Sequence, residues 1–167
     1  MIPQGFPGDS PGSVDQYLQS PTATDAFGRR LAEALKDSTG FLVTLEGELG
    51  AGKTSLVRAF LHGLGHTGRV RSPTYTLMEP YSVDGKQVLH LDLYRLGDPS
   101  ELEFLGFRDL IDEDHIVLIE WPERAGDLIP LPDLAIALSY EDEGRRIHIN
   151  AGTDRGKSLI SRFPAGE

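Results

Sequence analysis

The sequence contains no cysteine and no long hydrophobic run. Without cysteine, the chain forms neither disulfide bonds nor metal sites with thiolate ligands. No segment approaches the roughly 18 apolar residues of a transmembrane helix. The first residues, MIPQGFPGDSPGSVDQ, lack the basic and apolar regions of a signal peptide. We therefore expect a soluble protein that has no membrane partner and works in the reducing cytoplasm.

Positive charge is also scarce. Lysine and arginine number 16 against 26 aspartate and glutamate residues, which gives a net charge of -10. This charge opposes binding to the phosphate backbone of a nucleic acid. If the function involves nucleic acid, we expect another protein to hold it. The alternative is that the acidity only keeps the protein soluble.

The length of 167 residues predicts a single domain. Residues 1–21 contain several prolines, glycines and serines without an apolar period, which predicts a disordered N-terminal arm. We place the folded domain at residues 22–160 and a flexible C-terminus at residues 161–167. The first helix is expected at its start, where Thr22 and Asp25 resemble a capping box.

Hydrophobic periodicity and turn residues predict the remaining elements. The expected elements in chain order are a buried strand at 41–47, a helix at 53–64, a β-hairpin turning at 84–85, a short helix from 100, a buried strand at 116–121 and a closing hairpin of 134–140 with 145–151. They predict an α/β fold. We expect a P-loop NTPase-like sheet with helices on both faces, mixed parallel and antiparallel, with a β-hairpin after the P-loop helix.

The run GELGAGKT, which starts at Gly47, matches the phosphate-binding pattern G-x-x-x-x-G-K-[ST]. It lies between an expected strand and an expected helix, which is the context that such a loop requires. Glycines let the backbone N–H groups turn toward a polyphosphate, and the helix N-terminus adds its dipole. The residues expected to bind the nucleotide here are Glu48, Leu49, Gly50, Ala51, Gly52, Lys53, Thr54 and Ser55.

Mg²⁺ on a bound triphosphate needs a carboxylate as well as the Thr54 hydroxyl. Two candidates are Glu120, at the end of an apolar strand, and Asp92, on the polar face of the hairpin strand with His90. Alternatively, Glu120 is a solvated strand end and Asp92 is a structural partner of Arg95 or His90.

The loop VRSPTYTL, residues 70–77, leads into the hairpin and is polar and proline-restrained. Ser72 or Thr74 in this loop is a candidate for meeting the γ-phosphate, as switch loops do. The alternative is a turn capped by its own side chains. The loop residues by themselves leave both interpretations open.

Other phosphate-handling classes fit less well. A guanine-specific GTPase usually carries an N-K-x-D motif, but the only asparagine, Asn150, is followed by Ala-Gly-Thr. A small-molecule kinase should have an arginine-rich lid, whereas the arginines of this chain are scattered. The kinase remains the alternative function, and a module that binds ATP without hydrolysing it is a third.

Four strings together resemble the TsaE (YjeE) family of bacterial P-loop ATPases, which act in tRNA threonylcarbamoyladenosine formation. They are GELGAGKT, VRSPTYTLMEPY, HLDLYRLGDPSELEFLGFRDL and IEWPERAGDLIP, and they cover Gly47 to about Pro130. Several long motifs in one order are more specific than a single phosphate-binding loop. The N-terminal arm and the residues after about Gly152 add nothing to the resemblance.

The resemblance implies roles for particular residues. Lys53 would hold the phosphates, and Thr54 with Glu120 would bind Mg²⁺. Asp92 takes the place of the family's essential acidic residue, and we expect it to orient or activate the attacking water. Thr74 belongs to the family's switch-like loop, so we include Lys53, Asp92 and Thr74 as catalytic candidates.

The resemblance also implies contacts to the nucleotide base and to other proteins. Trp121 belongs to the family's Glu-Trp pair, and Arg145 resembles a position near the adenine, where an arginine plane stacks on a base. Residues 20–24 are a further candidate for an adenine contact. Family members are expected to act with TsaB and TsaD, which hold the tRNA, and ATP hydrolysis would drive or reset that complex. Hydrolysis by the chain alone should be weak.

Overall fold

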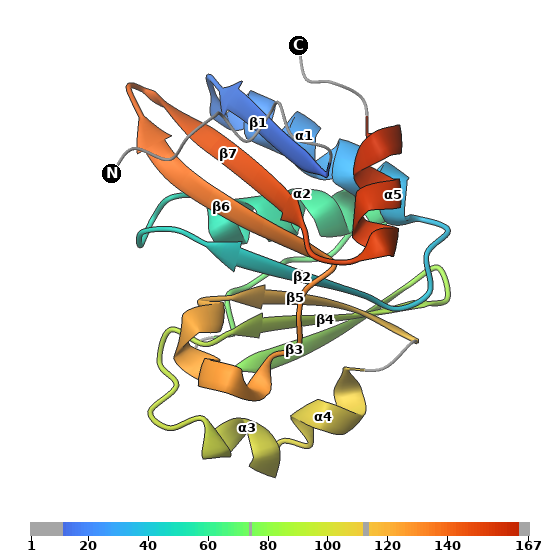
Figure 1. Ribbon diagram of the computed structural model, residues 1–167, viewed down its shortest axis with the longest axis vertical. Helices are drawn as coiled ribbons and strands as arrows, with labels where there is room; N and C mark the ends of the chain where they lie inside the picture. Colours follow the sequence, from blue (N-terminus) through green and yellow to red (C-terminus); the bar gives the residue numbers. More distant parts are fainter. Residues whose placement is uncertain (1–11, 74, 112–113, 164–167) are drawn as a thin grey trace.

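The computed structural model describes residues 12–73, 75–111 and 114–163. These residues form one mixed β-sheet with helices on both faces (Figure 1). The strand order across the sheet is β1-β7-β6-β2-β5-β4-β3. The strands are β1 Ser13–Leu18, β2 Phe41–Glu46, β3 Met78–Val83, β4 Lys86–Asp92, β5 His115–Glu120, β6 Leu134–Glu141 and β7 Gly144–Ala151.

The middle of the sheet is parallel and its edges are antiparallel. Strands β6, β2, β5 and β4 pair in parallel. The hairpins β3–β4 and β6–β7 and the pairing of β1 with β7 are antiparallel. The two central strands, FLVTLE and HIVLIE, are almost continuously apolar because both of their faces are covered by other elements.

The helices divide between the two faces of the sheet. The helices α1 Pro21–Leu35, α2 Lys53–Leu64 and α5 Asp154–Arg162 share one hydrophobic core, and α3 Ser100–Phe104, α4 Phe107–Leu110 and the 3₁₀ segment η2 Pro122–Leu128 share the other. Successive side chains of a strand point to opposite faces. Val43 of β2 therefore packs in the first core and Leu42 in the second.

The fold class predicted from the sequence is confirmed, and several elements lie where the sequence places them. The helix predicted at 53–64 spans the same residues, and Gly65 ends it in the left-handed conformation. The predicted hairpin after α2 turns at Asp84 and Gly85, which both have a positive φ, as a two-residue type I′ turn requires. Among the described residues, no helix has both the length and the apolar character needed to cross a membrane.

The N-terminal prediction is wrong for part of the segment assigned to a disordered arm. Residues Ser13–Leu18 form β1, which pairs with β7 along its whole length, and Leu18 is buried in the first core. The predicted capping box is also wrong, because Ser20 caps α1 by accepting a hydrogen bond from the N–H of Ala23. Residues 1–11 of the predicted arm lie outside the described residues.

The C-terminal prediction needs a similar correction. The sequence pattern predicts no helix after the closing hairpin and a flexible C-terminus from residue 161, yet α5 continues to Arg162. Thr153 caps this helix, and the ring of Phe163 packs 5.2 Å from that of Phe27 in α1. Burial of the apolar face of α5 against α1 and β7 explains why it forms. Residues 164–167 lie outside the described residues.

A buried carboxylate, Asp133, ties the start of β6 to β2 and α5. It accepts hydrogen bonds from the Leu42 N–H at 2.8 Å, the Thr153 hydroxyl at 2.6 Å and the Arg155 guanidinium at 2.9 Å. Burial by itself raises the pKa of Asp133, but the hydrogen bonds from Arg155, Thr153 and Leu42 outweigh it, so the net pKa is lowered. The ionised form is therefore the one that the fold stabilises.

We expect Asp133→Ala to lower the free energy of unfolding by about 3 kcal/mol, because it leaves a buried N–H without its acceptor and removes the buried carboxylate that pairs with the exposed Arg155. The lowered pKa gives the pH dependence its sign. The contribution of Asp133 is complete above the ordinary aspartate pKa of about 3.9 and is lost as the pH falls through the folded-state pKa. Urea unfolding at pH 7 and at lower pH measures both effects, with exposed Asp25→Ala as the control. Equal urea midpoints for Asp133→Ala and Asp25→Ala would contradict this account.

Candidate functional site

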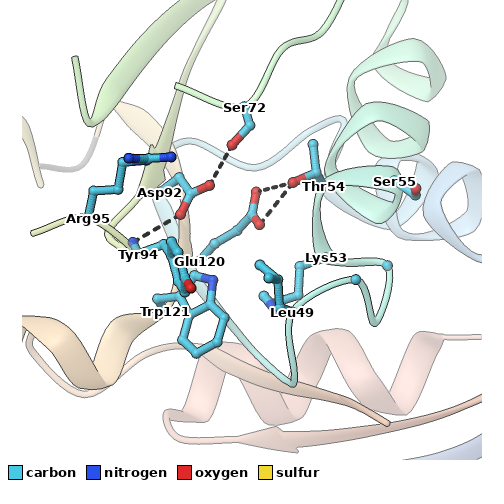
Figure 2. Close-up of a pocket in the computed structure, with 12 residues that line it drawn as sticks. Leu49, Lys53, Thr54, Ser55, Ser72, Asp92, Tyr94, Arg95, Glu120 and Trp121 are labelled. Carbon is cyan, nitrogen blue, oxygen red and sulfur yellow. Dashed lines mark hydrogen bonds between the residues drawn. The ribbon is translucent and has the colours of Figure 1, made fainter. Parts of the chain in front are cut away.

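A pocket of about 390 Å³ opens at the carboxyl ends of β2, β4 and β5, beside the start of α2 (Figure 2). Ligands of open α/β sheets bind at this edge, beyond the ends of the parallel strands. The glycine-rich loop after β2, the end of β4 and the end of β5 all contribute to it. The residues that line the pocket are Leu49, Gly50, Gly52, Lys53, Thr54, Ser55, Ser72, Asp92, Tyr94, Arg95, Glu120 and Trp121.

The loop between β2 and α2 depends on its glycines. Gly50 and Gly52 have φ angles of +81° and +109°, which side chains rarely adopt. A Cβ on Gly47 would lie 2.4 Å from the Leu138 carbonyl oxygen, so no larger residue fits there. Successive backbone N–H groups in such a loop, together with a helix N-terminus, form a binding site for anions.

The Lys53 side chain lies under this loop and is only 4% exposed. Its ammonium donates hydrogen bonds to the carbonyl oxygens of Gly47 at 2.5 Å and Glu48 at 2.9 Å, and it lies 4.3 Å from the centre of the Trp121 ring. Burial lowers the pKa of Lys53, while the nearby carboxylates of Glu120 and Asp92 act in the opposite direction. This places a cation where an anion held by the loop would meet it.

Glu120, at the end of β5, is the buried carboxylate of the pocket, with 2% exposure. Both of its oxygens accept from the Thr54 hydroxyl at 3.0 Å, and Oε2 is 2.6 Å from Nε2 of the fully buried His90. His90 Nδ1 has no hydrogen-bond partner within the described residues, so Nε2 is the nitrogen that donates. The histidine therefore orients Glu120 toward Thr54.

Asp92 ends β4 and lies beside Glu120 across the two paired strands. Its Oδ2 accepts from the Ser72 hydroxyl at 2.5 Å and its Oδ1 accepts from the N–H of Tyr94 at 3.1 Å (Figure 2). In the part of the chain that the structure describes, Asp92 is not paired with Arg95 or His90. Its carboxylate faces the pocket and is oriented by two neutral donors.

The structure brings most of the predicted site residues together. Leu49, Gly50, Gly52, Lys53, Thr54, Ser55, Asp92, Glu120 and Trp121 all line the one pocket. Glu48 and Ala51 belong to the same loop, and Arg145 of β7 holds it by donating to the Ala51 carbonyl at 2.9 Å. Residues 20–24, the further candidate for an adenine contact, do not line the pocket. Thr74 lies outside the described residues.

Sequence reasoning missed the aromatic and cationic side chains at the mouth of the pocket. Arg95 and Tyr94 line it, and the Tyr94 ring lies 4.9 Å from that of Trp121. The guanidinium of Arg124 lies over both rings. The available signal was that Tyr94 and Arg95 lie only two and three residues after Asp92, where the chain is still close to the strand end.

The donors in the pocket suit a hard divalent cation that shares its ligands with a bound phosphate. The Thr54 hydroxyl and a Glu120 carboxylate oxygen already meet, and such cations prefer oxygen ligands. Among the described residues, no group of three or more His, Asp or Glu side chains is arranged to hold a metal alone. A cation here would take its other ligands from phosphate and water.

A sequence model of the family described as threonylcarbamoyl adenosine biosynthesis protein TsaE matches residues 18–148. The chain belongs to the TsaE family. The structure of YdiB from Bacillus subtilis superposes with a TM-score of 0.77 and 28% sequence identity, covering 90% of this chain and 93% of that one. The resemblance found from the sequence motifs is thereby confirmed.

Curated relatives support the same assignment. The tRNA threonylcarbamoyladenosine biosynthesis protein TsaE of Haemophilus influenzae is 46% identical over 154 residues, which is 90% of this chain and 98% of the relative. The Bacillus subtilis protein of the same name is 34% identical, over 86% of this chain and 89% of the relative. Proteins of the TsaE family are involved in tRNA threonylcarbamoyladenosine biosynthesis.

Proposed function

We propose that this TsaE-family chain binds and hydrolyses Mg²⁺-ATP during the threonylcarbamoylation of adenosine 37 in tRNA. It would act with TsaB and TsaD, and hydrolysis would drive or reset their complex. The observation that carries the proposal is the meeting of Thr54 and Glu120 at the mouth of the glycine-rich loop. A hydroxyl at the helix start and a carboxylate at a neighbouring strand end form the metal-binding pair of P-loop ATPases.

Binding would begin with the glycine-rich loop. Its N–H groups and the N-terminus of α2 attract the phosphates, and Lys53 lies in reach because its ammonium contacts the loop itself. A triphosphate would replace the two loop carbonyls as the partner of Lys53 with stronger, charged acceptors. Trp121, over the Lys53 ammonium, excludes water from one side of this contact.

Mg²⁺ would be held by Thr54 and Glu120 and would neutralise charge on the phosphates. His90 keeps Glu120 in place by its hydrogen bond, and both side chains are buried. The remaining requirement is a group that positions the attacking water. Asp92 lies one strand away from Glu120 and presents its carboxylate to the pocket.

We propose that Asp92 positions the attacking water and that Arg95 supplies additional positive charge near the γ-phosphate. Asp92 is held by Ser72 and Tyr94, so its oxygens are already oriented before a nucleotide arrives. A positioned carboxylate accepts a hydrogen bond from the water and directs its lone pair at the γ-phosphate. Arg95 lines the same pocket and supports the charge that develops on the transferring group.

The test is ATP turnover of the purified chain, alone and with TsaB and TsaD, beside a Lys53→Ala control. We expect slow hydrolysis by the chain alone and a rise of about tenfold or more with both partners, as when a partner completes a GTPase site. Transfer of phosphate to a small-molecule acceptor would instead indicate a kinase. Tight Mg²⁺-ATP binding with no turnover under either condition would refute the hydrolytic part of the proposal.

A further inference from the structure

A second cavity, of about 610 Å³, lies on the outer side of α2 and is separate from the nucleotide pocket. It is formed by α2 and by the segment that follows it, residues 66–71. Arg58 and His62 come from the helix, and Arg69 and Arg71 come from the segment. We call this cavity the basic groove. The role proposed above for the chain makes no use of it.

Charge along the sequence is strongly segregated around the basic groove. The chain has 26 acidic residues, but none occurs between Glu48 and Glu79. The same interval contains all the arginines of the groove. The segment between these two residues is therefore basic, although the chain as a whole has a net charge of -10. A local positive potential attracts anions even on an acidic protein.

The arginines of the groove are available to an external anion. Arg58, Arg69 and Arg71 are exposed, and within the described residues no carboxylate pairs with any of them. Arg146 and Arg155, by contrast, form ion pairs with carboxylates of the chain. A guanidinium without an internal partner keeps its full set of donors for a ligand.

The walls of the groove are held together by two histidines. His62 Nε2 lies 3.2 Å from the carbonyl oxygen of Gly68, and His66 Nε2 lies 3.4 Å from that of Arg69. The His66 ring also meets the Tyr81 ring edge to face, with 5.0 Å between their centres. The first contact fixes the segment against α2, the second lies within the segment, and the third holds it against β3. The arginines of the segment therefore need less ordering when a ligand binds.

We propose that the basic groove binds phosphate groups of RNA, and specifically of the tRNA on which the TsaE pathway acts. Planar guanidinium groups match phosphate oxygens with paired hydrogen bonds, and backbone contacts of this kind need no base sequence. RNA is a better match than an acidic protein surface because tRNA is the molecule modified in this family's pathway. The proposal needs family membership but not ATP hydrolysis.

The net charge of -10 by itself predicts that the chain reaches tRNA only through other proteins. The groove adds a direct contact of limited size, while the acidic remainder of the surface repels the RNA and so restricts the orientation in which it can approach. Arg71 directly precedes Ser72, whose hydroxyl bonds to Asp92, so a bound phosphate would lie next to the segment that reaches the nucleotide pocket.

The experiment is a titration of fluorescently labelled, unmodified tRNA with the full chain, without nucleotide, followed by anisotropy over a series of salt concentrations. We expect binding at low salt that weakens as salt rises. In a plot of the logarithm of the association constant against the logarithm of the salt concentration, each phosphate contact should contribute about -0.7 to -0.9 to the slope. The triple variant Arg58→Ala, Arg69→Ala, Arg71→Ala should bind tRNA about tenfold or more weakly. The magnitude of its salt-dependence slope should be smaller by about two to three.

A matched variant separates the groove from net charge. Arg29→Ala, Arg108→Ala, Arg162→Ala removes the same charge from exposed arginines elsewhere, and it should bind tRNA almost as well as the native chain. Circular dichroism checks that both triple variants are folded. The proposal is overturned if the native chain binds no tRNA at the lowest salt, or if the two variants lose affinity equally. It is also overturned if a polyglutamate peptide competes for the groove as well as unlabelled tRNA does.

Discussion

Asp92→Asn should reduce ATP turnover by about a hundredfold to a thousandfold while leaving Mg²⁺-ATP affinity within about threefold of the native value. Asparagine keeps the shape of the side chain and an oxygen that can accept from Ser72 or Tyr94. It removes the negative charge that we propose orients the water. A loss confined to kcat is the signature of an interaction made only in the transition state.

Turnover in the presence of TsaB and TsaD, together with Mg²⁺-ATP affinity measured separately, tests this expectation. Ser72→Ala is the companion variant, because it leaves the Asp92 carboxylate ionised but removes one of its two donors, so its effect on kcat should be smaller. Arg95→Ala should also slow turnover more than it weakens binding. Normal turnover by Asp92→Asn in the complete complex would show that another group positions the water.

Lys53→Ala should weaken Mg²⁺-ATP binding by about a hundredfold or more, because it removes charge-assisted hydrogen bonds worth about 3 kcal/mol. The fold should survive. The variant loses two hydrogen bonds to loop carbonyls, but it also removes an ammonium whose burial is unfavourable, as its lowered pKa indicates. A thermal unfolding series with rising nucleotide measures both points. The native chain should gain stability with nucleotide, and the variant should gain almost none.

The control for Lys53 is Lys36→Ala, which removes an exposed ammonium at the end of α1 and should leave the nucleotide response unchanged. If Lys53→Ala were stabilised by ATP to the same extent as Lys36→Ala, the glycine-rich loop would not be the phosphate site. If Lys53→Ala failed to fold, calorimetric titration of Lys53→Met, which retains the buried side-chain stem, would provide the same comparison.

Local signals in the sequence were sufficient to predict the helix and the hairpin that position the site. The helix Lys53–Leu64 begins and ends at glycines in the left-handed conformation, and its apolar stripe is visible in the sequence. The turn at Asp84 and Gly85 likewise specifies its own hairpin. The approach of Thr54 to Glu120, which are 66 residues apart, followed from the rule that parallel strand ends gather at one edge.

The elements that were missed depend on distant partners. Strand β1 is flanked by glycine, proline and serine, and its pairing partner β7 lies near the other end of the chain. Helix α5 forms against α1 and β7, and its short apolar face was too weak a signal by itself. The contact of His90 with Glu120 was missed for a related reason, because Asp92 was the only carboxylate considered for His90 and the pairing of β4 with β5 brings Glu120 within reach.

Calorimetric titration of the purified chain with ATP, with and without Mg²⁺, shows whether the pocket at the glycine-rich loop binds the nucleotide. We expect saturable one-to-one binding in the micromolar to millimolar range that is common for enzyme substrates, strengthened by Mg²⁺ and impaired in Glu120→Gln. The magnesium dependence should be smaller in that variant, because one of the two proposed protein ligands has lost its charge. Absence of ATP binding up to about 1 mM in the presence of Mg²⁺ would contradict the account.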